Sequence, residues 1–375
     1  MEQSAQRALL FFSSCGENDS FGNPSSIHWA GRKAKSALDT AREKVAAAVG
    51  ASDPDLICFT GSATEATNLA IKGFYFQNAK KKLRVITSRL EHEATLETCG
   101  FLQEWAGVEI QYLESNAGGQ ISLEQLGEIL QESQSTTLVS LMAANNETGV
   151  IFPWADAARI SKNSGALFHL DAVQALGKIP RFTLENSDVD LASFSAHKIG
   201  GPKGVGALYI RKGVALTSLI HGGVQERKRR AGTVNVAGIA AFGEAAATLQ
   251  ARDLGAVSVL RDFLESRVLE RIAGAHIHGK KEKRLGNTSN FLFDNVRGEA
   301  LIMGLDLEGF AVSSGSACNS GSILPSHVLL AMGLEKTAAQ SAVRVSLAPS
   351  NAKAEIEEFV VALEKIVARI RAQKK

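Results

Sequence analysis

The chain has 375 residues, of which 45% are hydrophobic and 21% are charged, and its formal net charge at pH 7 is +2. A chain of this length can bury a large core and favours two domains, while the near-neutral charge excludes capture of nucleic acid by an overall positive field. No apolar stretch approaches the roughly 20 residues of a membrane-spanning helix, and the first residues are not typical of a signal peptide, so we expect a cytoplasmic protein.

The first two-thirds of the chain is typical of an α/β domain. After an irregular segment over residues 1–20, a turn at Asn23-Pro24 and apolar residues at helical spacing from Ile27 to Val45 predict a helix that ends at Gly50. Short β-rich runs and helical patterns then alternate, which indicates a mainly parallel sheet. The predicted strands cover residues 56–60, 84–88, 108–113, 137–142, 166–170, 189–193 and 205–210, and the predicted helices cover residues 64–74, 123–132 and 154–163.

The last third is predicted to form a second, smaller α+β domain. A long helical region over residues 236–272 leads into it. Strands are predicted over residues 287–293, 311–313 and 343–347, and helices over residues 298–307, 326–332 and 353–371. We therefore expect a large domain over residues 21–250 and a small domain over residues 251–375.

One lysine, Lys198, follows a short apolar strand and precedes a glycine-rich loop. A lysine amine whose pKa is lowered by burial or by neighbouring positive charge is a nucleophile toward carbonyl groups. Most lysines are solvated surface charges, and this alternative stands while Lys198 is considered alone. The segment indicates Schiff-base chemistry, which in an α/β enzyme points to pyridoxal 5'-phosphate.

Other predicted strands end on groups that this cofactor requires. Asp171 can keep the pyridine nitrogen protonated, and Gln174 can hydrogen-bond the phenolic oxygen. At residues 60–68 a strand turns directly into a helix, whose N-terminal N–H groups favour a phosphate, and Thr64 adds a hydroxyl there. His92 can stack on the ring and later move protons. The ordinary alternatives are a turn, a capped helix and a structural histidine.

Together these segments resemble the class V aminotransferase superfamily, and specifically its group I cysteine desulfurases, which serve iron–sulfur cluster assembly. The similarity runs from about Phe21 to Arg344. Its motifs are FGNPSSIH at 21–28, ATE at 63–65, EH at 91–92, NNETG at 145–149, DAVQ at 171–174, SAHK at 195–198, RAGTVN at 230–235 and SSGSAC at 313–318. The resemblance implies pyridoxal-phosphate-dependent transferase fold type I and a homodimer.

The resemblance also implies a role for each matching residue around the cofactor ring. Lys198 carries the cofactor as a Schiff base, and Asp171 pairs with the pyridine nitrogen. Gln174 and Asn146 contact the phenolic oxygen, and His92 stacks on the ring.

Further implied roles concern the cofactor phosphate and the substrate carboxylate. Arg344 clamps the carboxylate, a task that suits its bidentate guanidinium, and Asn146 assists in substrate binding. Thr233 reaches the phosphate from the other subunit of the homodimer. The remaining phosphate ligands are Ala63, Thr64, Ser195 and His197.

Cys318 is the residue that points to the reaction. Small polar residues surround it, and they predict a loop over about residues 312–325 that leaves the thiol exposed, whereas Cys58 lies in an apolar run typical of a buried thiol. The family resemblance implies that L-cysteine is converted to L-alanine and that a persulfide forms on Cys318. The sulfur then passes to an acceptor, typically an iron–sulfur scaffold or another sulfur-carrier protein. Cys15 and Cys99 receive no role, and no cysteine spacing indicates a metal site.

Two segments depart from the family pattern. The family usually begins with a strand that carries an Asp and an Ala-Thr-Thr run, which residues 9–16 do not contain. A Gly-Arg-Phe-Thr motif often follows the carboxylate-binding arginine, whereas residues 346–351 read SLAPSN. The alternatives are therefore a selenocysteine lyase or another class V aminotransferase-type enzyme, or an inactive dimeric homologue that acts as a binding partner.

Overall fold

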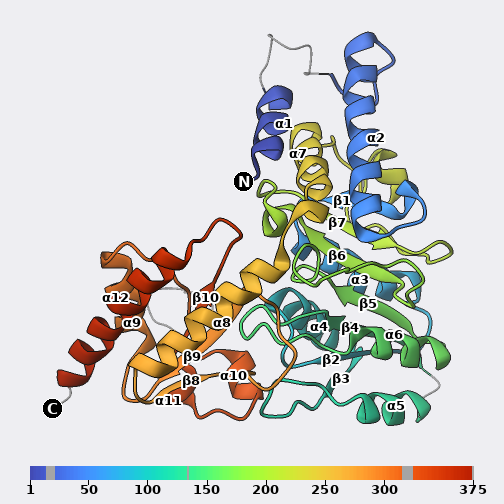
Figure 1. The fold of residues 1–375 in the computed structure, drawn as a ribbon. Coiled ribbons are helices and arrows are strands. Elements are labelled where there is room, and N and C mark those ends of the chain that lie inside the picture. The colour runs from blue at the N-terminus through green and yellow to red at the C-terminus, as the bar shows by residue number, and fades with distance from the viewer. Residues whose placement is uncertain (14–21, 133–134, 315–323, 374–375) are drawn as a thin grey trace.

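The structure is a computed structural model in which residues 1–13, 22–132, 135–314 and 324–373 are described. Within these ranges the chain forms a seven-stranded sheet and a three-stranded sheet. The two sheets lie side by side, each with its own helices (Figure 1). No helix of this described part is both long and apolar enough to span a membrane.

The large sheet has the strand order β1-β7-β6-β5-β4-β2-β3. Its strands are β1 Ile57–Thr60, β2 Leu83–Ser88, β3 Glu109–Leu113, β4 Thr136–Met142, β5 Leu167–Asp171, β6 Leu191–Ser195 and β7 Gly206–Ile210. In the described sheet, β7 runs antiparallel to both of its neighbours, and the other pairs are parallel. The prediction of a mainly parallel sheet is confirmed, and the carboxyl ends of β2, β4, β5 and β6 meet at one edge.

Helices cover both faces of this sheet, which explains why several of its strands are largely apolar. On β4, Leu138 packs into one hydrophobic cluster and Val139 into another on the opposite face. The covering helices are α2 Trp29–Val49, α3 Ala63–Gln77, α4 Glu93–Ala106, α5 Leu123–Gln131, α6 Trp154–Asn163 and α7 Val236–Ala247. Helix α2 ends as predicted, at Gly50, whose φ of 72° is one that glycine adopts readily.

The prediction of an irregular segment over residues 1–20 is wrong for its first part, because α1 spans Gln3–Ser13. Ala5 is fully buried in the main core, and Ala8 and Leu9 pack against that core. Helix α1 lies alongside α7 (Figure 1). The run of helically spaced apolar residues is short, and no capping signal precedes it. Packing against α7 therefore stabilises the helix.

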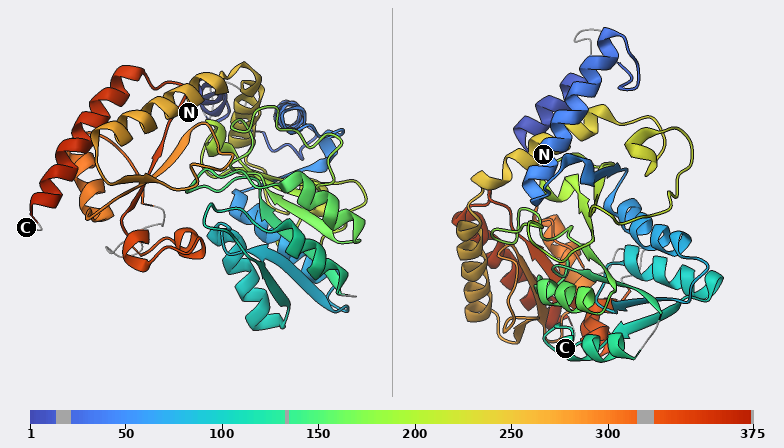
Figure 2. Two further views of the ribbon diagram at one scale, coloured as in Figure 1. Left: turned by 60° about the horizontal axis from the view of Figure 1, so that its bottom comes forward. Right: turned by 90° about the vertical axis from the view of Figure 1, so that its right-hand side faces the viewer.

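The second part of the chain has a hydrophobic core of its own, which includes Leu264, Phe291, Leu301 and Val360. Its antiparallel sheet has the order β10-β9-β8, with β8 Ala275–Ile277, β9 Thr288–Phe293 and β10 Ala342–Ser346. Helices α8 Leu254–Arg271, α9 Gly298–Leu307 and α12 Lys353–Ala372 pack around it, as the views in Figure 2 show.

Three predictions for this second part need correction. The long helix over residues 236–272 is interrupted between α7 and α8, where the Asp253 side chain accepts a hydrogen bond from the Ala256 N–H and starts a new helix. The strand at 311–313 is reduced to one bridge between Ser313 and Arg344. The short helices α10 His327–Ala331 and α11 Lys336–Ala339 follow, and α10 is shorter than the predicted 326–332.

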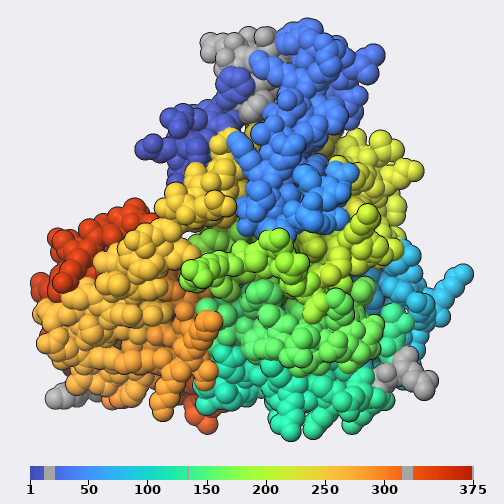
Figure 3. Space-filling view, turned by 45° about the vertical axis from the view of Figure 1, so that its right-hand side comes forward, coloured from blue at the N-terminus to red at the C-terminus, as the bar shows by residue number. Residues whose placement is uncertain are grey.

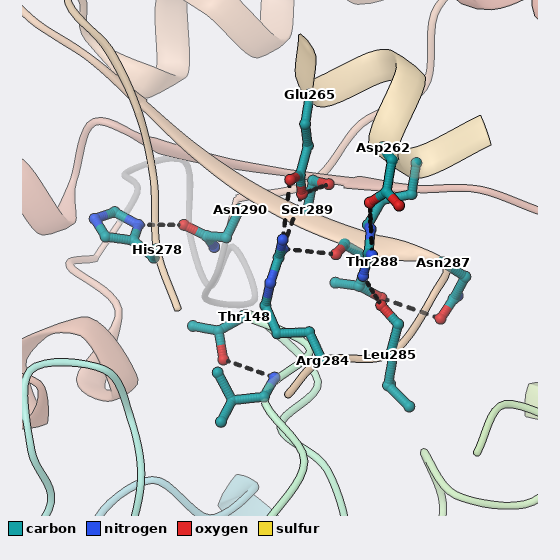
Figure 4. A network of polar contacts seen from close by, with 12 residues as sticks. Thr148, Asp262, Glu265, His278, Arg284, Leu285, Asn287, Thr288, Ser289 and Asn290 are labelled. Carbon is teal, nitrogen blue, oxygen red and sulfur yellow. Dashed lines mark hydrogen bonds and ion pairs between the residues drawn. The ribbon is translucent and has the colours of Figure 1, made fainter. Parts of the chain in front are cut away.

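A buried polar network joins the two parts of the chain. Arg284 forms an ion pair with Glu265, and both side chains are almost fully buried. The Ser289 hydroxyl donates to Glu265 Oε1 at 2.6 Å. Figure 4 shows these side chains together. A backbone hydrogen bond extends this connection to the large part of the chain, because the Leu285 N–H donates to the Gly149 carbonyl at 2.7 Å. The loop that carries Asn146 is thereby fixed between the two sheets.

Candidate active site

A cavity of about 560 Å³ opens at the carboxyl edge of the large sheet. Its lining comes from both parts of the chain, which lie against each other in the space-filling view (Figure 3). The large part contributes Asp171 and Lys198, and the small part contributes Ile302 and Arg344. This is the position at which open α/β sheets bind their ligands.

Lys198 lies in a short 3-10 helix, Ala196–Ile199, that directly follows β6. The turn closes at Gly200, whose φ is 83°, and it brings the Lys198 amine to the cavity. Burial lowers the pKa of Lys198, the positive charge of Arg344 lowers it further, and Asp171 acts in the opposite direction. The environment therefore depresses the lysine pKa, as Schiff-base chemistry requires.

Asp171 is the last residue of β5, and only 8% of it is exposed. Its Oδ1 accepts a hydrogen bond from the Val173 N–H at 3.0 Å. Burial raises the pKa of Asp171, whereas that hydrogen bond and the neighbouring His92 and Lys198 lower it. A buried carboxylate of this kind favours a cationic N–H donor as its partner.

His92 lies at the start of α4, a helix that the sequence patterns did not predict. Its Nδ1 accepts a hydrogen bond from the Ala94 N–H at 3.0 Å and so caps the helix. This bond fixes the tautomer of a neutral imidazole, because Nδ1 must be the unprotonated nitrogen. The ring lines the cavity together with Asp171, so a structural and a functional role coexist at His92.

At one end of the cavity, α3 begins directly after β1. The Ser62 hydroxyl accepts a hydrogen bond from the Glu65 N–H, which leaves Ala63 and Thr64 at the helix start facing the cavity. Ser195 and His197 line the same cavity, with 2.8 Å between the Ser195 Oγ and the His197 Nδ1. Strand β7 packs closely against the start of α3. A Cβ added at Gly206, the first residue of β7, would lie only 2.4 Å from the Ser62 carbonyl carbon.

The side of the cavity formed by the small part holds Arg344 of β10, whose Nη1 donates to the Asn146 carbonyl at 3.0 Å. Burial lowers the pKa of Arg344, although the nearby Glu147 raises it. Gln174 lines the same cavity. Thr233 is exposed and does not line the cavity of its own chain as far as the described residues show.

The described cysteines are both buried and free: Cys58 lies in β1 and Cys99 in α4. Burial raises the pKa of each thiol to about 12. Neither thiol is available as a nucleophilic thiolate near neutral pH. The prediction for Cys58 is confirmed, and Cys318 and Cys15 lie outside the described residues.

Comparison with known proteins agrees with this site. Residues 16–359 match the family model described as Aminotransferase class-V. The chain is 44% identical to a cysteine desulfurase IscS of Dictyoglomus turgidum, covering 94% of this chain and 89% of that one. Identity to a cysteine desulfurase of Cereibacter sphaeroides is also 44%, with 94% and 90% covered. A solved NifS-like protein superimposes with a TM-score of 0.89 at 39% identity, covering 98% and 96%.

The chain belongs to the cysteine desulfurases of the class-V aminotransferase family. The arrangement of its large sheet and helices is fold type I of the pyridoxal-phosphate-dependent transferases. The cysteine desulfurases are pyridoxal-phosphate-dependent enzymes. The resemblance inferred from the motifs is thereby confirmed.

The donor set of the cavity fits the cofactor of this desulfurase family. A buried carboxylate, Asp171, is available for the pyridine nitrogen, and the amine of Lys198 lies in the same cavity. The hydroxyls of Thr64 and Ser195 and the first N–H groups of α3 suit a phosphate. The residues present therefore match each chemical part of pyridoxal phosphate.

Sequence reasoning missed three residues around this desulfurase site. Glu147 is 1% exposed, and its Oε2 accepts a hydrogen bond from the Ser326 hydroxyl at 2.5 Å. His327 lines the cavity, and its Nε2 donates to the Glu91 carbonyl at 2.8 Å. Lys178 donates to Gln174. Glu147 was visible only as part of the NNETG motif, and no pattern marks the other two.

Replacing Glu147 with glutamine is expected to stabilise the protein at alkaline pH. Burial raises the pKa of Glu147 from 4.5 to about 7. The folded state therefore holds a proton that the unfolded state releases, and stability falls as the pH rises between these two values. The penalty reaches about 3 kcal/mol above pH 7, and the uncharged glutamine avoids it.

Urea unfolding of the wild type and Glu147→Gln at pH 5 and pH 8 measures this effect. The stability advantage of the variant should grow between the two pH values, while Glu128→Gln, a change at an exposed position of α5, should show no such growth. Equal advantages of Glu147→Gln at both pH values would rule out a buried, protonated Glu147.

Proposed function

We propose that this chain binds pyridoxal phosphate and converts L-cysteine to L-alanine, with the sulfur transferred to Cys318. The observation that carries the proposal is the meeting of Lys198 and Asp171 in one cavity, in a chain that belongs to the cysteine desulfurases. Lys198 is the covalent anchor of the cofactor, and Asp171 holds the proton of the pyridine nitrogen. His92 would stack on the ring, and Gln174 would contact the phenolic oxygen.

The phosphate and the substrate carboxylate would be held by different residues of the cavity. Ala63, Thr64, Ser195 and His197 bind the phosphate, and Thr233 reaches it from the second subunit of a homodimer. Arg344 clamps the carboxylate of cysteine through a paired set of N–H donors. Its contact with the Asn146 carbonyl holds the guanidinium at the cavity and places Asn146 beside the substrate.

Lys198 also moves a proton during the reaction. When bound, pyridoxal phosphate supplies an electron sink that stabilises negative charge at the substrate Cα. With the cofactor bound, the free amine of Lys198 would remove the Cα proton and later return it, and its lowered pKa keeps part of it in the unprotonated form.

Cys318 takes the sulfur from the substrate. Its thiolate attacks the substrate sulfur, so an S–S bond forms while the Cβ–S bond breaks. The electron pair of the broken bond stays with carbon, which takes up a proton and becomes the methyl group of L-alanine. A persulfide remains on Cys318 for an acceptor thiol or scaffold protein.

The wider setting follows the same proposal. We propose a cytoplasmic homodimer that delivers sulfur to an iron–sulfur scaffold or a sulfur-carrier protein, for cluster assembly or thiolation. The chain divides near residue 250 into a large cofactor-binding domain and a small domain that carries the Cys318 loop. The separate hydrophobic core around Leu264 and Phe291 supports this division.

Reconstitution tests the proposed function. Purified protein is incubated with pyridoxal phosphate and then with L-cysteine, and alanine and sulfide are quantified together. The expected result is an absorbance band of bound cofactor and equal amounts of the two products. Cofactor uptake with activity on selenocysteine alone would support a selenocysteine lyase, and failure to take up the cofactor would support an inactive homologue.

A further inference from the structure

A second lysine, Lys178, contacts a residue of the proposed ring site. It follows β5 in the same turn-rich segment as Gln174, and its Nζ donates a hydrogen bond to the Gln174 Oε1. Gln174 in turn lines the cavity beside Asp171 and Lys198. Lys178 itself does not line the cavity, so any action on a bound group passes through another residue.

The chemistry of the two side chains fixes the orientation of the amide. A lysine ammonium group has only donors, so the group that faces it must be the amide oxygen of Gln174. The amide NH₂ of Gln174 is then the end left for the cavity, and it can only donate. In the absence of the ammonium group, the amide can turn over and present its oxygen instead, because the two ends have the same shape.

The charged groups around Lys178 on the neighbouring elements are basic. They are Lys198 and His197 of the 3-10 helix after β6, Arg344 of β10, and Arg252 in the turn before α8. Burial, together with the positive charges of Lys198, Arg344 and Arg252, lowers the pKa of Lys178 to about 7. A positive charge at Lys178 therefore opposes a positive charge at the nitrogen of Lys198.

We propose that Lys178 is a positioning residue that turns the Gln174 amide so that its NH₂ group donates to the phenolic oxygen of pyridoxal phosphate. This inference rests on the proposed function, since it concerns the same cofactor site. A donor at that oxygen stabilises its negative charge and weakens its hold on the proton of the neighbouring Lys198 nitrogen. Lys178 thus holds down the pKa of that nitrogen in two ways, through the amide and through its own charge.

The test is a pH titration of the absorbance of the cofactor-loaded protein, which reports the protonation of the Lys198 nitrogen without reference to activity. Lys178→Met should move the midpoint up by about one pH unit, a tenfold change in the proton dissociation constant. Lys178→Arg keeps the charge and the donors and should restore the wild-type midpoint. Lys162→Met is the matched control, because Lys162 lies on α6 and pairs with Asp188. The titration midpoint of this variant should equal that of the wild type.

A double-variant comparison tests the route through Gln174. If Lys178 acts through the amide, Lys178→Met should shift the midpoint less in a Gln174→Ala background than in the wild type. An equal shift in both backgrounds, or no shift in Lys178→Met, overturns the proposal. If Lys178→Met does not fold, as judged by thermal unfolding without the cofactor, Lys178→Gln takes its place. This variant replaces the ammonium group with an uncharged polar group, and the same upward shift of the midpoint is expected.

The outcomes separate this inference from the function on which it rests. Wild-type protein that takes up no pyridoxal phosphate contradicts the proposed function itself. Wild-type protein with a normal absorbance band, together with an unmoved midpoint in Lys178→Met and Lys178→Gln, contradicts only the role of Lys178.

Discussion

Replacing Lys198 with alanine is expected to lower kcat for alanine formation by at least about 1,000-fold. Under the proposed function, the variant loses both the covalent anchor of the cofactor and the base that removes the Cα proton. Lys198 lies in the cavity with its pKa lowered by burial and by Arg344, and no other lysine lines the cavity in the described part of the chain.

Steady-state alanine formation and the absorbance of the purified variant measure this effect together. Lys203→Ala is the matched control, because Lys203 is an exposed lysine in the loop that follows Lys198. It should retain wild-type activity and absorbance. A Lys198→Ala protein with an intact cofactor band and more than a tenth of wild-type kcat would remove Lys198 from the mechanism.

Replacing Cys318 with alanine is expected to abolish sulfide release from cysteine, again by about 1,000-fold or more, while the cofactor band stays unchanged. In the proposed reaction, the substrate Cβ–S bond breaks only when a thiolate accepts the sulfur. The two described cysteines cannot replace it, since burial raises the pKa of Cys58 and of Cys99 to about 12.

Sulfide released in the presence of a thiol reductant is the measured quantity. Cys99→Ala serves as the control, because this thiol is buried in α4 away from the cavity and its loss should leave sulfide release intact. Unchanged sulfide release from the Cys318→Ala protein would exclude Cys318 as the sulfur acceptor.

The sequence predicted the large sheet well because most of its strands are buried on both faces and several are therefore largely apolar. The same property located the site, since Asp171 and Lys198 are polar residues that interrupt the apolar pattern where β5 and β6 end. The carboxyl ends of neighbouring parallel strands lie at one edge of the sheet. The sequence alone therefore indicated that these residues meet there.

Other elements carry no such signal. Helix α4 was missed because its buried face includes Thr95 and Thr98 beside Cys99, which hides the apolar period. Helix α1 depends on packing against α7, and β8 has only three residues. Arg344 was assigned to the site only through the family resemblance. No local sequence pattern relates it to Asn146, which lies 198 positions away in the chain.

The supporting residues of the site also could not be predicted. Glu147 and Ser326 are 179 positions apart, and their contact exists only because α10 packs on the large part of the chain. Lys178 has an unremarkable sequence context, and its place behind Gln174 follows from the turn that ends β5. Such contacts arise from tertiary packing, which periodicity does not encode.

Mass spectrometry of the protein after incubation with L-cysteine tests the central claim most directly. The cofactor-loaded protein is alkylated without reduction, digested, and compared with the Cys318→Ala variant. We predict one added sulfur atom on the peptide that contains Cys318, which is absent from the protein kept without L-cysteine. Alanine formation without added sulfur at Cys318, or added sulfur on Cys15 instead, would contradict the proposed transfer.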